Sequence, residues 1–514
     1  MAEISSNKTI AKNTILLYGR MVFTMLVSLY TTRVILSTLG VIDDGIYNVV
    51  GGVVGMFTFL KGALSGATSR FITFELGKGD KEKLNQTFSA ALLVHFILAV
   101  GLIVILETAG LWYVNHKLNV PEDRLFAAKI VYQLSVLAIL FSVTQVPYNA
   151  TIVAHEKMSV FAYFSILEVV LKLLICYATV ISPYDKLITY AALLLAVSIL
   201  IRMACRVYCV RHFEECHMVK VTQRGIIKPI LTFSTWDLFG NFSSMARDQG
   251  VDMILNYFFG PAINSAAGKA GTICNAVNGL AHNFLTAIKP PIVKAYSMGD
   301  IKRMEGLMID ASKYSYVCLM LFAAPFFFES KFVIDLWLKN PPAYAEVFCS
   351  VDLGLSVLIS MFLPLVYAIH ASGKIRFMSV VNGSIWLTVV PITYFMLKAG
   401  GAPIVPYIVK YGLLVFVVIS NFYSVKKNIP EFDRRLYLRK AFLPSIISAA
   451  IVLTVTFCVY RLFPGPSWWR ILSVCVTTTI TLGLSSFFIV FDKHIREEVI
   501  AKILSVMRKR TAND

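Results

Sequence analysis

Long apolar stretches recur along the whole chain, and they constrain its fold more than any other feature of the sequence. A helix needs about 20 mainly apolar residues to cross the hydrocarbon core of a bilayer, and we find about fourteen such stretches in the 514 residues. Fourteen crossings use roughly 300 residues, so only short loops remain between them. The sequence therefore predicts an all-α polytopic membrane protein and excludes a large soluble catalytic domain.

The predicted spans form a group of six, a second group of six and a final pair. Their ranges are 14–39, 45–74, 88–111, 125–150, 160–181, 187–210, 230–259, 262–292, 307–328, 347–370, 377–397, 403–424, 441–462 and 471–491. We predict a six-helix lobe over 1–211, a second six-helix lobe over 226–425, two extra transmembrane helices over 441–491 and a cytoplasmic tail over 492–514. Apolar residues recur at helical spacing in the tail, which is typical of an amphipathic helix on the membrane surface or of a solvated helix.

The charge balance agrees with this topology. Only 15% of the residues are charged, yet the formal net charge is +18, whereas soluble proteins carry about 25% charged residues. Most basic loop residues fall on one side of the predicted topology, as expected of cytoplasmic loops, so both termini are predicted to be cytoplasmic. The first apolar stretch contains Arg20 and Arg33 and has no small-residue cleavage site, so it is not a cleaved signal. The expected partner is the lipid bilayer and not nucleic acid.

The two groups of six spans show a weak internal repeat. The aligned positions include Lys8 with Lys228, Gly40 with Gly260, Gly51 with Gly271, Gly79 with Gly299 and Asp80 with Asp300. A repeat of an even number of helices predicts two pseudo-symmetric lobes related by an axis along the membrane normal, with a central site between them.

Polar residues share one helix face in the first two spans of each group. Such residues are costly in lipid and normally face a water-filled cavity or a partner. The stripe residues are Arg20, Thr24 and Ser28 in the first span, Lys61 in the second, Asp237, Asn241, Asp248 and Asp252 in the seventh, and Asn275, Asn278, His282 and Lys289 in the eighth. Isolated Ser, Thr and Asn residues often form only interhelical hydrogen bonds. For stripes that carry Arg, Lys or three Asp residues, we predict a hydrated lumen.

Other charges lie beside or away from the stripes. Arg247 is next to Asp248 and is a candidate partner that neutralises it. Arg33, Arg70 and Lys269 point away from the polar faces of their helices. Arg33 and Arg70 lie near helix ends, where long side chains reach the membrane interface.

The sequence contains no recognisable catalytic or cofactor motif. There is no G-x-x-x-x-G-K-[ST] loop, no His-Glu-x-x-His and no nucleophile elbow. Cys205, Cys209, His212 and Cys216 share one helical face, but a continuous helix spreads them over about 16 Å, too far for tetrahedral zinc. Only a helix break near Arg211 would allow a metal site. We predict no catalytic residue, no metal and no cofactor.

Three segments resemble a known family. Residues 33–88 read RVILSTLGVIDDGIYNVVGGVVGMFTFLKGALSGATSRFITFELGKGDKEKLNQTF, residues 252–268 read DMILNYFFGPAINSAAG, and residues 283–300 read NFLTAIKPPIVKAYSMGD. They resemble the bacterial polysaccharide transporter (O-antigen flippase) family, which belongs to the superfamily of multidrug, oligosaccharidyl-lipid and polysaccharide exporters. The likeness covers nearly the whole chain, and its motifs are structural, so they identify the family better than the substrate.

The resemblance implies two pseudo-symmetric six-helix lobes plus two C-terminal helices, and transport by alternating access in the bacterial plasma (inner) membrane. It also implies the substrate, a glycan repeat unit on undecaprenyl diphosphate that moves from the cytoplasmic to the outer leaflet during lipopolysaccharide or related polysaccharide biosynthesis. Other polysaccharide-assembly proteins are further candidate partners. Members of the family bind the diphosphate with lumen cations, which in this chain would be Arg20, Lys61, Arg247, Lys269 and Lys289.

Simple physical chemistry leads to a similar site. A diphosphate cannot cross hydrocarbon unaided, because burying its charges without partners costs many kcal/mol, and Arg or Lys can replace its hydration. Asp237, Asp248 and Asp252 can bind protons or Na⁺ and couple transport to an ion gradient. Our hypothesis is coupling through Asp248, so Asp248→Asn should fold but lose its dependence on the pH gradient.

Two other functions are weighed against the flippase. A cation-coupled multidrug antiporter of the same superfamily would favour an anionic, aromatic lumen, which Arg20 and Lys61 oppose and the three Asp residues support. A glycan polymerase or ligase would need a sizeable outer loop, and the longest outer segments, 112–124 and 329–346, are short. We therefore predict a transporter and not an enzyme.

Overall fold

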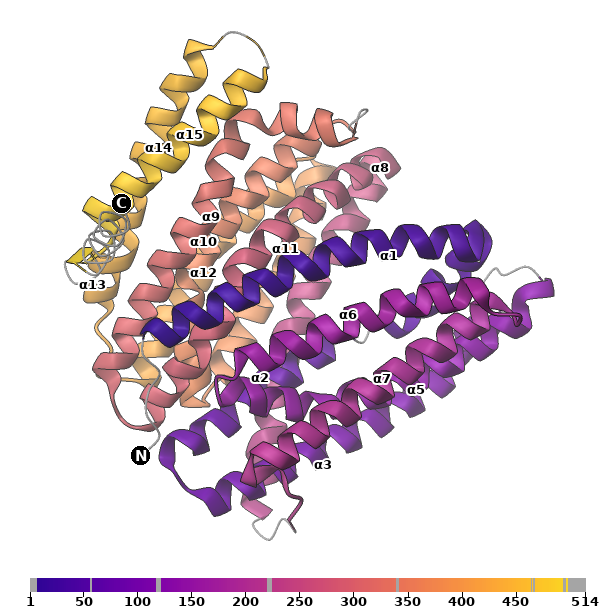
Figure 1. The fold of residues 1–514 in the computed structure, drawn as a ribbon. Coiled ribbons are helices and arrows are strands. Elements are labelled where there is room, and N and C mark those ends of the chain that lie inside the picture. The colour runs from indigo at the N-terminus through magenta and orange to yellow at the C-terminus, as the bar shows by residue number, and fades with distance from the viewer. Residues whose placement is uncertain are drawn as a thin grey trace, which may run out of the picture. The chain divides into compact units, whose positions relative to one another are not determined.

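The computed structural model describes residues 7–55, 58–116, 122–219, 224–338, 342–463, 465, 467–492 and 496–497. These residues form helices and no strands (Figure 1), which confirms the all-α prediction. Ten helical segments among them are long and apolar enough to cross a membrane. The helices α1, α2 and α8, which contain the predicted polar stripes, are not among these ten.

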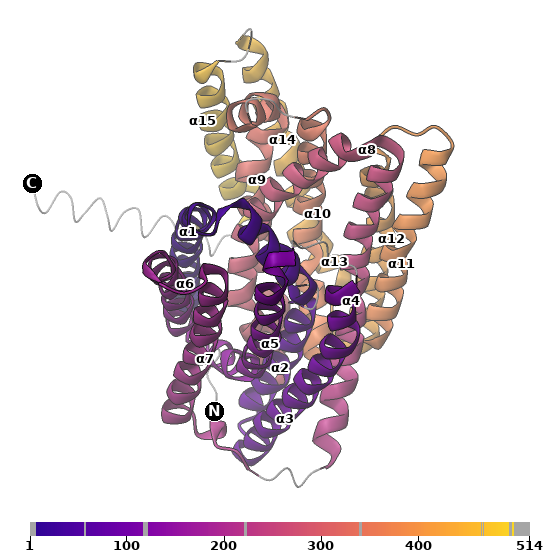
Figure 2. The same ribbon diagram turned by 90° about the vertical axis from the view of Figure 1, so that its right-hand side faces the viewer.

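The first compact unit consists of Met1–Met245, Thr286–Asp300 and His370–Gly383. Its helices are α1 (Asn7–Gly55), α2 (Thr58–Lys78), α3 (Lys81–Ile105), α4 (Leu111–His116), α5 (Leu125–Ala154), α6 (Met158–Ile181) and α7 (Lys186–His212), with parts of α8 (Arg224–Ser297), α10 (Ala345–Ser372) and α11 (Arg376–Lys398). Helix α5 packs against α2, α3 and α7, and α1 packs along α6 (Figure 2). The central position of α5 accounts for its long run of buried residues.

The second unit consists of Ala246–Leu285, Ile301–Ile369 and Ser384–Asp514. It contains the rest of α8, α10 and α11, with α9 (Ile301–Leu338), α12 (Val405–Asn428), α13 (Arg434–Tyr437), α14 (Leu443–Leu462) and α15 (Trp468–Ser485). Helices α14 and α15 pack against each other and against α9, so the final pair of predicted spans belongs to this unit.

Short irregular turns extend several helices. The π-helical turns are η1 (Leu106–Gly110), η4 (Leu438–Phe442) and η5 (Ser486–Val490), and the 3₁₀ turns are η2 (Glu122–Arg124) and η3 (Glu214–Cys216).

The seventh and eighth predicted spans are joined end to end in α8. The break between them is a single residue, Gly260, with φ 77° and ψ −174°. Glycine adopts this conformation without steric cost, and Pro261 suits the first turn of the helix that follows. The sequence thus predicts the position of this break to within two residues.

The first predicted break differs from the observed one. We expected a loop at 40–44, but α1 continues through these residues and ends at Gly55. Asp43, which lies in this stretch, accepts hydrogen bonds from Arg124. A charge that is paired in this way no longer requires an exposed loop.

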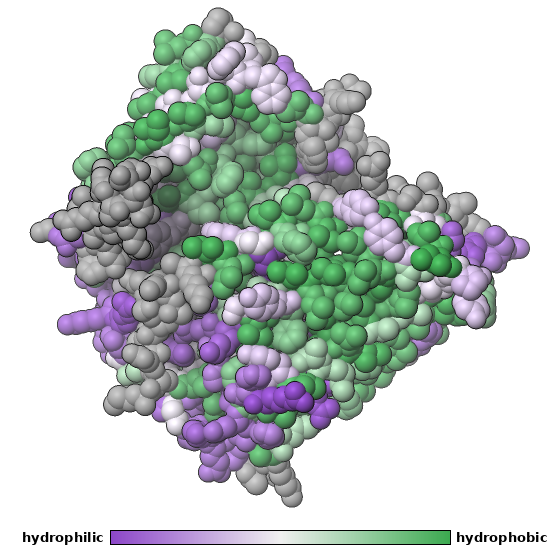
Figure 3. Space-filling view, viewed as in Figure 1, coloured by the Kyte–Doolittle hydropathy of each residue, from purple (hydrophilic) through white to green (hydrophobic). Residues whose placement is uncertain are grey.

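The surface of the helices is apolar along their sides. Large hydrophobic side chains such as Phe96, Val104, Val415 and Phe416 are exposed. Figure 3 shows hydrophobic residues over the middle of the helices on one face, and hydrophilic residues gathered towards the lower end. This distribution is typical of helices whose sides contact lipid. Most of the predicted amphipathic tail, including 498–514, lies outside the described residues.

Candidate functional site

Two clusters of ionisable side chains lie in the helices that carry the polar stripes, one in each unit. We call Arg70, Asp237, Lys289 and His370 the Asp237 cluster, which belongs to the first unit. Arg247, Asp248, Asp252 and Lys410 form the Asp248 cluster, which belongs to the second unit.

The centre of the Asp237 cluster is a buried carboxyl–imidazole pair. Asp237 of α8 is 8% exposed and His370, in the last turn of α10, is 7% exposed. Nε2 of His370 lies 3.6 Å from Oδ1 of Asp237, slightly beyond an ordinary hydrogen bond. The other ring nitrogen of His370, Nδ1, is buried and has no hydrogen-bond partner among the described residues. The imidazole and the carboxylate therefore face each other without forming an ordinary hydrogen bond.

A glycine in α2 allows the charged groups to approach this helix. A Cβ atom at Gly66 would lie 3.1 Å from Oδ2 of Asp237 and 3.8 Å from Nζ of Lys289. Both side chains therefore converge on the bare backbone of Gly66, and Lys289 is close enough to interact electrostatically with Asp237. A negative and a positive charge thus lie close to the same backbone position.

Arg70 of α2 caps the C-terminus of α10. Its Nε donates to the carbonyl of His370 at 3.0 Å, and its Nη2 donates to the carbonyl of Ala371 at 2.9 Å. The last carbonyls of a helix have no partner within the helix and form the negative end of its dipole. The guanidinium also packs on the rings of Phe71 and Phe74, at 4.5 and 4.7 Å from their centroids.

The burial of Arg70 corrects our expectation that its side chain reaches the membrane interface. The residue is only 6% exposed, because the helix end of α10 supplies the acceptors that water or headgroups would otherwise provide. Gly373 completes this contact: its φ is 75°, and a Cβ atom there would lie 2.6 Å from Nη2 of Arg70. Only glycine fits this position without displacing the guanidinium.

The Asp248 cluster consists of ion pairs at short distances. Arg247 donates to both carboxylate oxygens of Asp248, at 2.9 and 2.8 Å, as the neighbouring positions in the sequence predict. Nζ of Lys410, from α12, lies 3.3 Å from Oδ1 of Asp248. The Asp248 side chain is 49% exposed, and Asp252 one turn later is half-buried.

Aromatic rings hold both cations of the Asp248 cluster. The Arg247 guanidinium lies 4.5 Å from the ring centroid of Trp386, and Nζ of Lys410 lies 5.3 Å from that of Tyr407. Contacts of this kind stabilise a cation through the ring quadrupole. Arg247 and Lys410 are thus fixed by two kinds of contact each.

Arg20, the first predicted lumen cation, lies in α1 and is partly exposed. Its Nη1 donates to Oγ of Ser165 in α6 at 3.4 Å, and Phe161 covers its guanidinium at 5.0 Å. One turn further along α1, the hydroxyl of Thr24 donates to the carbonyl of Met21. The side chain of Lys61 lies outside the described residues.

The remaining predicted site residues are on α1 and α8. The exposed ones are Ser28, Asn241, Lys269, Asn275 and His282. The side-chain amide of Asn241 donates to the carbonyl of Asp237 at 2.8 Å. Asn278 is half-buried, and its amide donates to the hydroxyl of Ser356 at 3.0 Å. Asn278 therefore forms the interhelical hydrogen bond that we had considered as the alternative for such residues.

Sequence reasoning missed three members of the clusters. It gave Arg70 a different position, and it did not single out His370 or Lys410. Lys410 lies inside the predicted span 403–424, so an ionisable residue in an apolar segment was the available signal. His370 is the last residue of the predicted span 347–370 and gave no such signal, because helix ends commonly carry polar residues.

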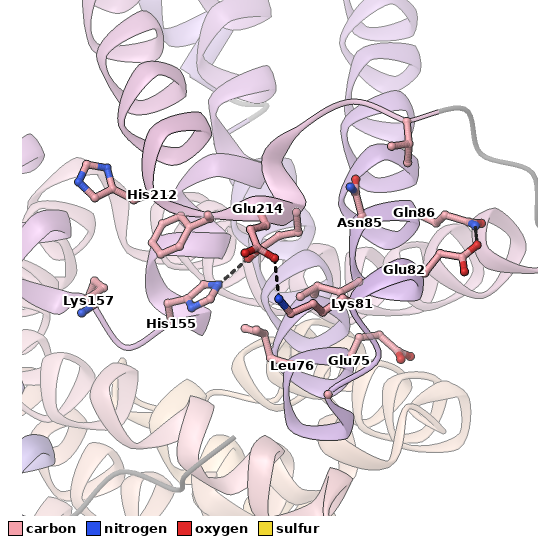
Figure 4. A pocket seen from close by; sticks show the side chains of 15 residues that line it. Glu75, Leu76, Lys81, Glu82, Asn85, Gln86, His155, Lys157, His212 and Glu214 are labelled. Atoms are coloured by element: carbon pink, nitrogen blue, oxygen red, sulfur yellow. Dashed lines mark hydrogen bonds and ion pairs between the residues drawn. The ribbon is translucent and has the colours of Figure 1, made fainter. Parts of the chain in front are cut away.

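A separate cavity of about 940 Å³ lies in the first unit, where α2 meets α3 and α7 ends (Figure 4). Its lining includes Lys81 and Glu214, whose charged groups are 2.7 Å apart, and His155, which contacts Glu215. The ion pair between Glu214 and Lys81 lowers the pKa of the Glu214 carboxyl. The charges of this cavity are largely satisfied within its own wall.

The described residues contain no group of three or more His, Cys, Asp and Glu side chains that could hold a metal ion. The residues of the cysteine-rich face make other contacts. The Cys205 thiol contacts the side chains of Asn149 and Gln145, and the ring of His212 stacks on Tyr208.

The sequence is similar to one curated membrane protein over most of its length. No family model matches the chain. It is 23% identical over 497 residues to "Uncharacterized membrane protein EpsK" of Bacillus subtilis (strain 168), which covers 92% of this chain and 94% of that protein.

Several solved structures share the fold. One is described as "Reverse polarity of binding pocket suggests different function of a MOP superfamily transporter from Pyrococcus furiosus Vc1 (DSM3638)", with a TM-score of 0.66, 14% identity, and coverage of 83% of this chain and 98% of that one. Another is a MATE protein carrying a single substitution, with a TM-score of 0.65, 14% identity and coverage of 82% of this chain and 95% of that one. The fold is that of a MATE-type transporter.

A third structure with the MATE-type fold is described as an outward-facing multidrug resistance MATE family transporter of the MOP superfamily. Its TM-score is 0.64 at 14% identity, and the match covers 83% of this chain and 99% of that one. These likenesses confirm the predicted two-lobed, multi-pass helical architecture. At this level of identity they establish the MATE-type fold alone.

Proposed function

We propose that the protein is a flippase that moves an undecaprenyl-diphosphate-linked oligosaccharide from the cytoplasmic to the outer leaflet of the bacterial plasma membrane by alternating access. The observation that carries this proposal is Arg20, a partly exposed guanidinium inside a membrane-spanning chain. Ser165 and Phe161 of α6 hold its side chain in place. An oriented, partly accessible guanidinium in such a chain suits an anionic substrate.

The chemistry of the substrate supports this assignment. A diphosphate that enters a membrane protein loses its hydration, and guanidinium donors replace it with charge-assisted hydrogen bonds. Arg also presents its donors as a planar fork that matches oxyanions. The lipid tail can remain in the bilayer, which explains why a lumen need only accept the diphosphate and the sugars. The resemblance of residues 33–88, 252–268 and 283–300 to polysaccharide transporters points to the same substrate class.

Ion coupling is part of the proposal. The carboxylates of Asp237, Asp248 and Asp252 lie along α8, where a proton or Na⁺ can bind. Ionisable residues inside membrane proteins commonly serve as ion relays. An ion gradient would then drive the return of the transporter to its inward-facing state.

A multidrug antiporter is the second candidate, and two observations favour it. Solved structures with this fold include MATE proteins described as multidrug transporters, and the three Asp residues of α8 could attract a cationic drug. The neighbouring structure described as having a reversed pocket polarity indicates that the MATE-type fold accommodates pockets of either sign. The charge of the substrate therefore has to be tested directly.

The test is a flipping assay in proteoliposomes. A fluorescent undecaprenyl diphosphate oligosaccharide would be exposed to a membrane-impermeant quencher, and the protein should accelerate its exposure. We expect Arg20→Ala to lose the acceleration, Arg20→Lys to retain part of it, and Ser165→Ala, which keeps the cation, to remain active. Normal flipping by Arg20→Ala would contradict the assigned role of Arg20. No acceleration by the wild type, together with uptake of a cationic dye, would favour the antiporter.

A further inference from the structure

We propose that the Asp237 cluster is a proton-binding site in which Nε2 of His370 and Oδ1 of Asp237 share one proton, and that this proton is the coupling ion. The second part rests on the proposed transport function, whereas proton binding does not. In the unprotonated state the imidazole is neutral and faces a carboxylate. Proton uptake forms an N–H bond at Nε2 and converts the contact into an imidazolium–carboxylate pair, and release returns the proton to water.

The geometry of the pair supports this inference. Both residues are more than nine-tenths buried, and Nε2 of His370 lies 3.6 Å from Oδ1 of Asp237. A small approach would close this distance to that of a charge-assisted hydrogen bond. Nδ1 of His370 has no hydrogen-bond partner in the part of the chain that the structure describes, and an unpaired polar atom in a buried position is costly. The ring is thus held in a position that structural stability alone does not favour.

The charges around the pair oppose one another. Burial of the ring opposes a positive charge on His370, and the positive charges of Lys289 on α8 and Arg70 on α2 also repel a proton. The facing carboxylate of Asp237 attracts one. Glu75 of α2 and Tyr296 of α8 interact electrostatically with Arg70. Both signs of charge are therefore represented on the helices packed against the pair. A balance of this kind allows a proton to bind and to leave.

The donor set fits a proton and does not fit Na⁺. A hard cation needs several oxygen ligands, but three of the four cluster members, Arg70, Lys289 and His370, present nitrogen, and two of these carry permanent donors. A proton needs only one acceptor atom with a nearby counter-charge. The Asp237 cluster offers that arrangement at a single 3.6 Å contact.

Proton binding at this site would change the link between three helices. His370 is in the last turn of α10, Arg70 of α2 binds the same helix end through two carbonyls, and Asp237 is on α8. A proton that draws His370 towards Asp237 moves the end of α10 relative to Arg70. Arg70 is therefore a positioning residue, which fixes the imidazole by holding the backbone that carries it.

The Asp248 cluster provides a matched comparison within the same chain. Asp248 is bound by both Arg247 and Lys410 at 2.8–3.3 Å, and no imidazole is among these contacts. Its charge is compensated in the resting structure. The inference thus assigns coupling to Asp237 and His370 in place of Asp248, which the sequence had suggested. Glu168→Gln is the control, because Glu168 pairs with Lys172 on α6 at 2.7 Å and belongs to neither cluster.

The experiment has one readout without substrate and one with it. Infrared difference spectra between acidic and neutral pH, recorded on reconstituted protein, should show changes in carboxyl and imidazole bands. We expect both bands to disappear together in Asp237→Asn and also in His370→Asn, because the two groups share one proton. Both should persist in Glu168→Gln. In the flipping assay, an imposed pH gradient should accelerate the wild type and Glu168→Gln but leave the two cluster variants at their rate without a gradient.

The outcomes separate the two proposals. Bands that survive in Asp237→Asn, or that titrate independently, would overturn the proton site whatever the substrate is. Loss of gradient dependence in Asp248→Asn alone would overturn the assignment of coupling. If the bands behave as expected but the wild type flips no lipid-linked glycan, the proton site stands and the flippase proposal fails. If Asp237→Asn does not fold, His370→Asn and His370→Gln provide the same test from the other side of the pair.

Discussion

The two ionic clusters contain similar residues but differ in how completely their charges are paired. In the Asp248 cluster, Arg247 and Lys410 approach the carboxylate to within ordinary hydrogen-bonding or ion-pair distance, and the Asp248 side chain is half exposed. In the Asp237 cluster, the carboxylate is almost fully buried, and its contact with His370 is longer, at 3.6 Å. Burial raises the free-energy cost of a charged carboxylate. A buried carboxylate with only a long contact to its partner can therefore change its protonation state more readily than one that is closely paired. The comparison shows that charge type alone does not identify a site that can bind a proton.

The largest difference should appear when each carboxylate is removed. Asp237→Ala removes a buried carboxylate that faces His370 and interacts electrostatically with Lys289. It should cost about 3 kcal/mol, as is typical when one member of a buried pair is removed. Asp248→Ala should cost about 1 kcal/mol, as is typical of exposed pairs. The melting temperatures of the detergent-purified variants measure this difference. Equal losses would show that burial does not distinguish the clusters.

The two arginines should also differ in their effect on stability. Arg70→Leu removes two hydrogen bonds from the C-terminus of α10 and should cost about 2 kcal/mol, since bonds to charged groups contribute more than neutral ones. Arg247→Leu should cost less, because water can reach the half-exposed Asp248 carboxylate. Arg70→Lys, which keeps the charge but cannot make both bonds, should lie between wild type and Arg70→Leu. Thermal unfolding in detergent provides the comparison, and a neutral Arg70→Leu would contradict the capping role.

A glycine pair isolates the contact between Gly373 and Arg70. Gly373 and Gly79 both have φ 75°, but only at Gly373 does a Cβ atom meet a neighbour, at 2.6 Å from Nη2 of Arg70. Replacement by Ala should cost about 1 kcal/mol at either position from backbone strain. The clash should add about 1 kcal/mol at Gly373 alone. The excess should vanish when Gly373→Ala is combined with Arg70→Leu, and an excess that persists would point to another cause.

The smallest effect concerns the ion pair between Arg124 and Asp185, a carboxylate that lies outside the candidate spans. Burial opposes ionisation of Asp185 in the α6–α7 turn, but the hydrogen bond from Arg124 outweighs it and lowers the pKa of this carboxyl. A lowered pKa contributes stability above the unfolded value of about 3.9, and this stability is lost as the pH falls through the folded pKa. Arg124→Ala should therefore cost about 1 kcal/mol, and this cost should be constant between about pH 5 and 8.

His370→Asn provides the contrast to Arg124→Ala. If the Asp237 cluster exchanges a proton, the effect of His370→Asn on the melting temperature should change with pH. Melting curves at a series of pH values would compare the two variants. A cost for His370→Asn that does not vary with pH would weaken the distinction between the clusters.

Local patterns in the sequence were sufficient for much of the fold. Apolar stretches predicted the helices, and the Gly260–Pro261 step predicted the break inside α8, because backbone conformation there depends on the residue types themselves. The Arg247–Asp248 pair was also predictable, since its members are neighbours in the chain. The extension of α1 through 40–44 was not, because it depends on Arg124, which is distant in the sequence from Asp43.

The sequence by itself determined that this chain forms membrane-spanning helices and which faces of them are polar, because apolar length and helical periodicity are local properties. Only the tertiary structure decided which charges meet. Arg70 binds carbonyls 300 and 301 positions further along the chain, and His370 faces Asp237 from a different helix. Periodicity assigns a side chain to a face of its own helix, but the partner across that face depends on how distant helices pack. For this reason, the sequence predicted Asp237 only as one of three carboxylates on one face and favoured Asp248 for coupling, and the contact of Asp237 with His370 emerged from the fold.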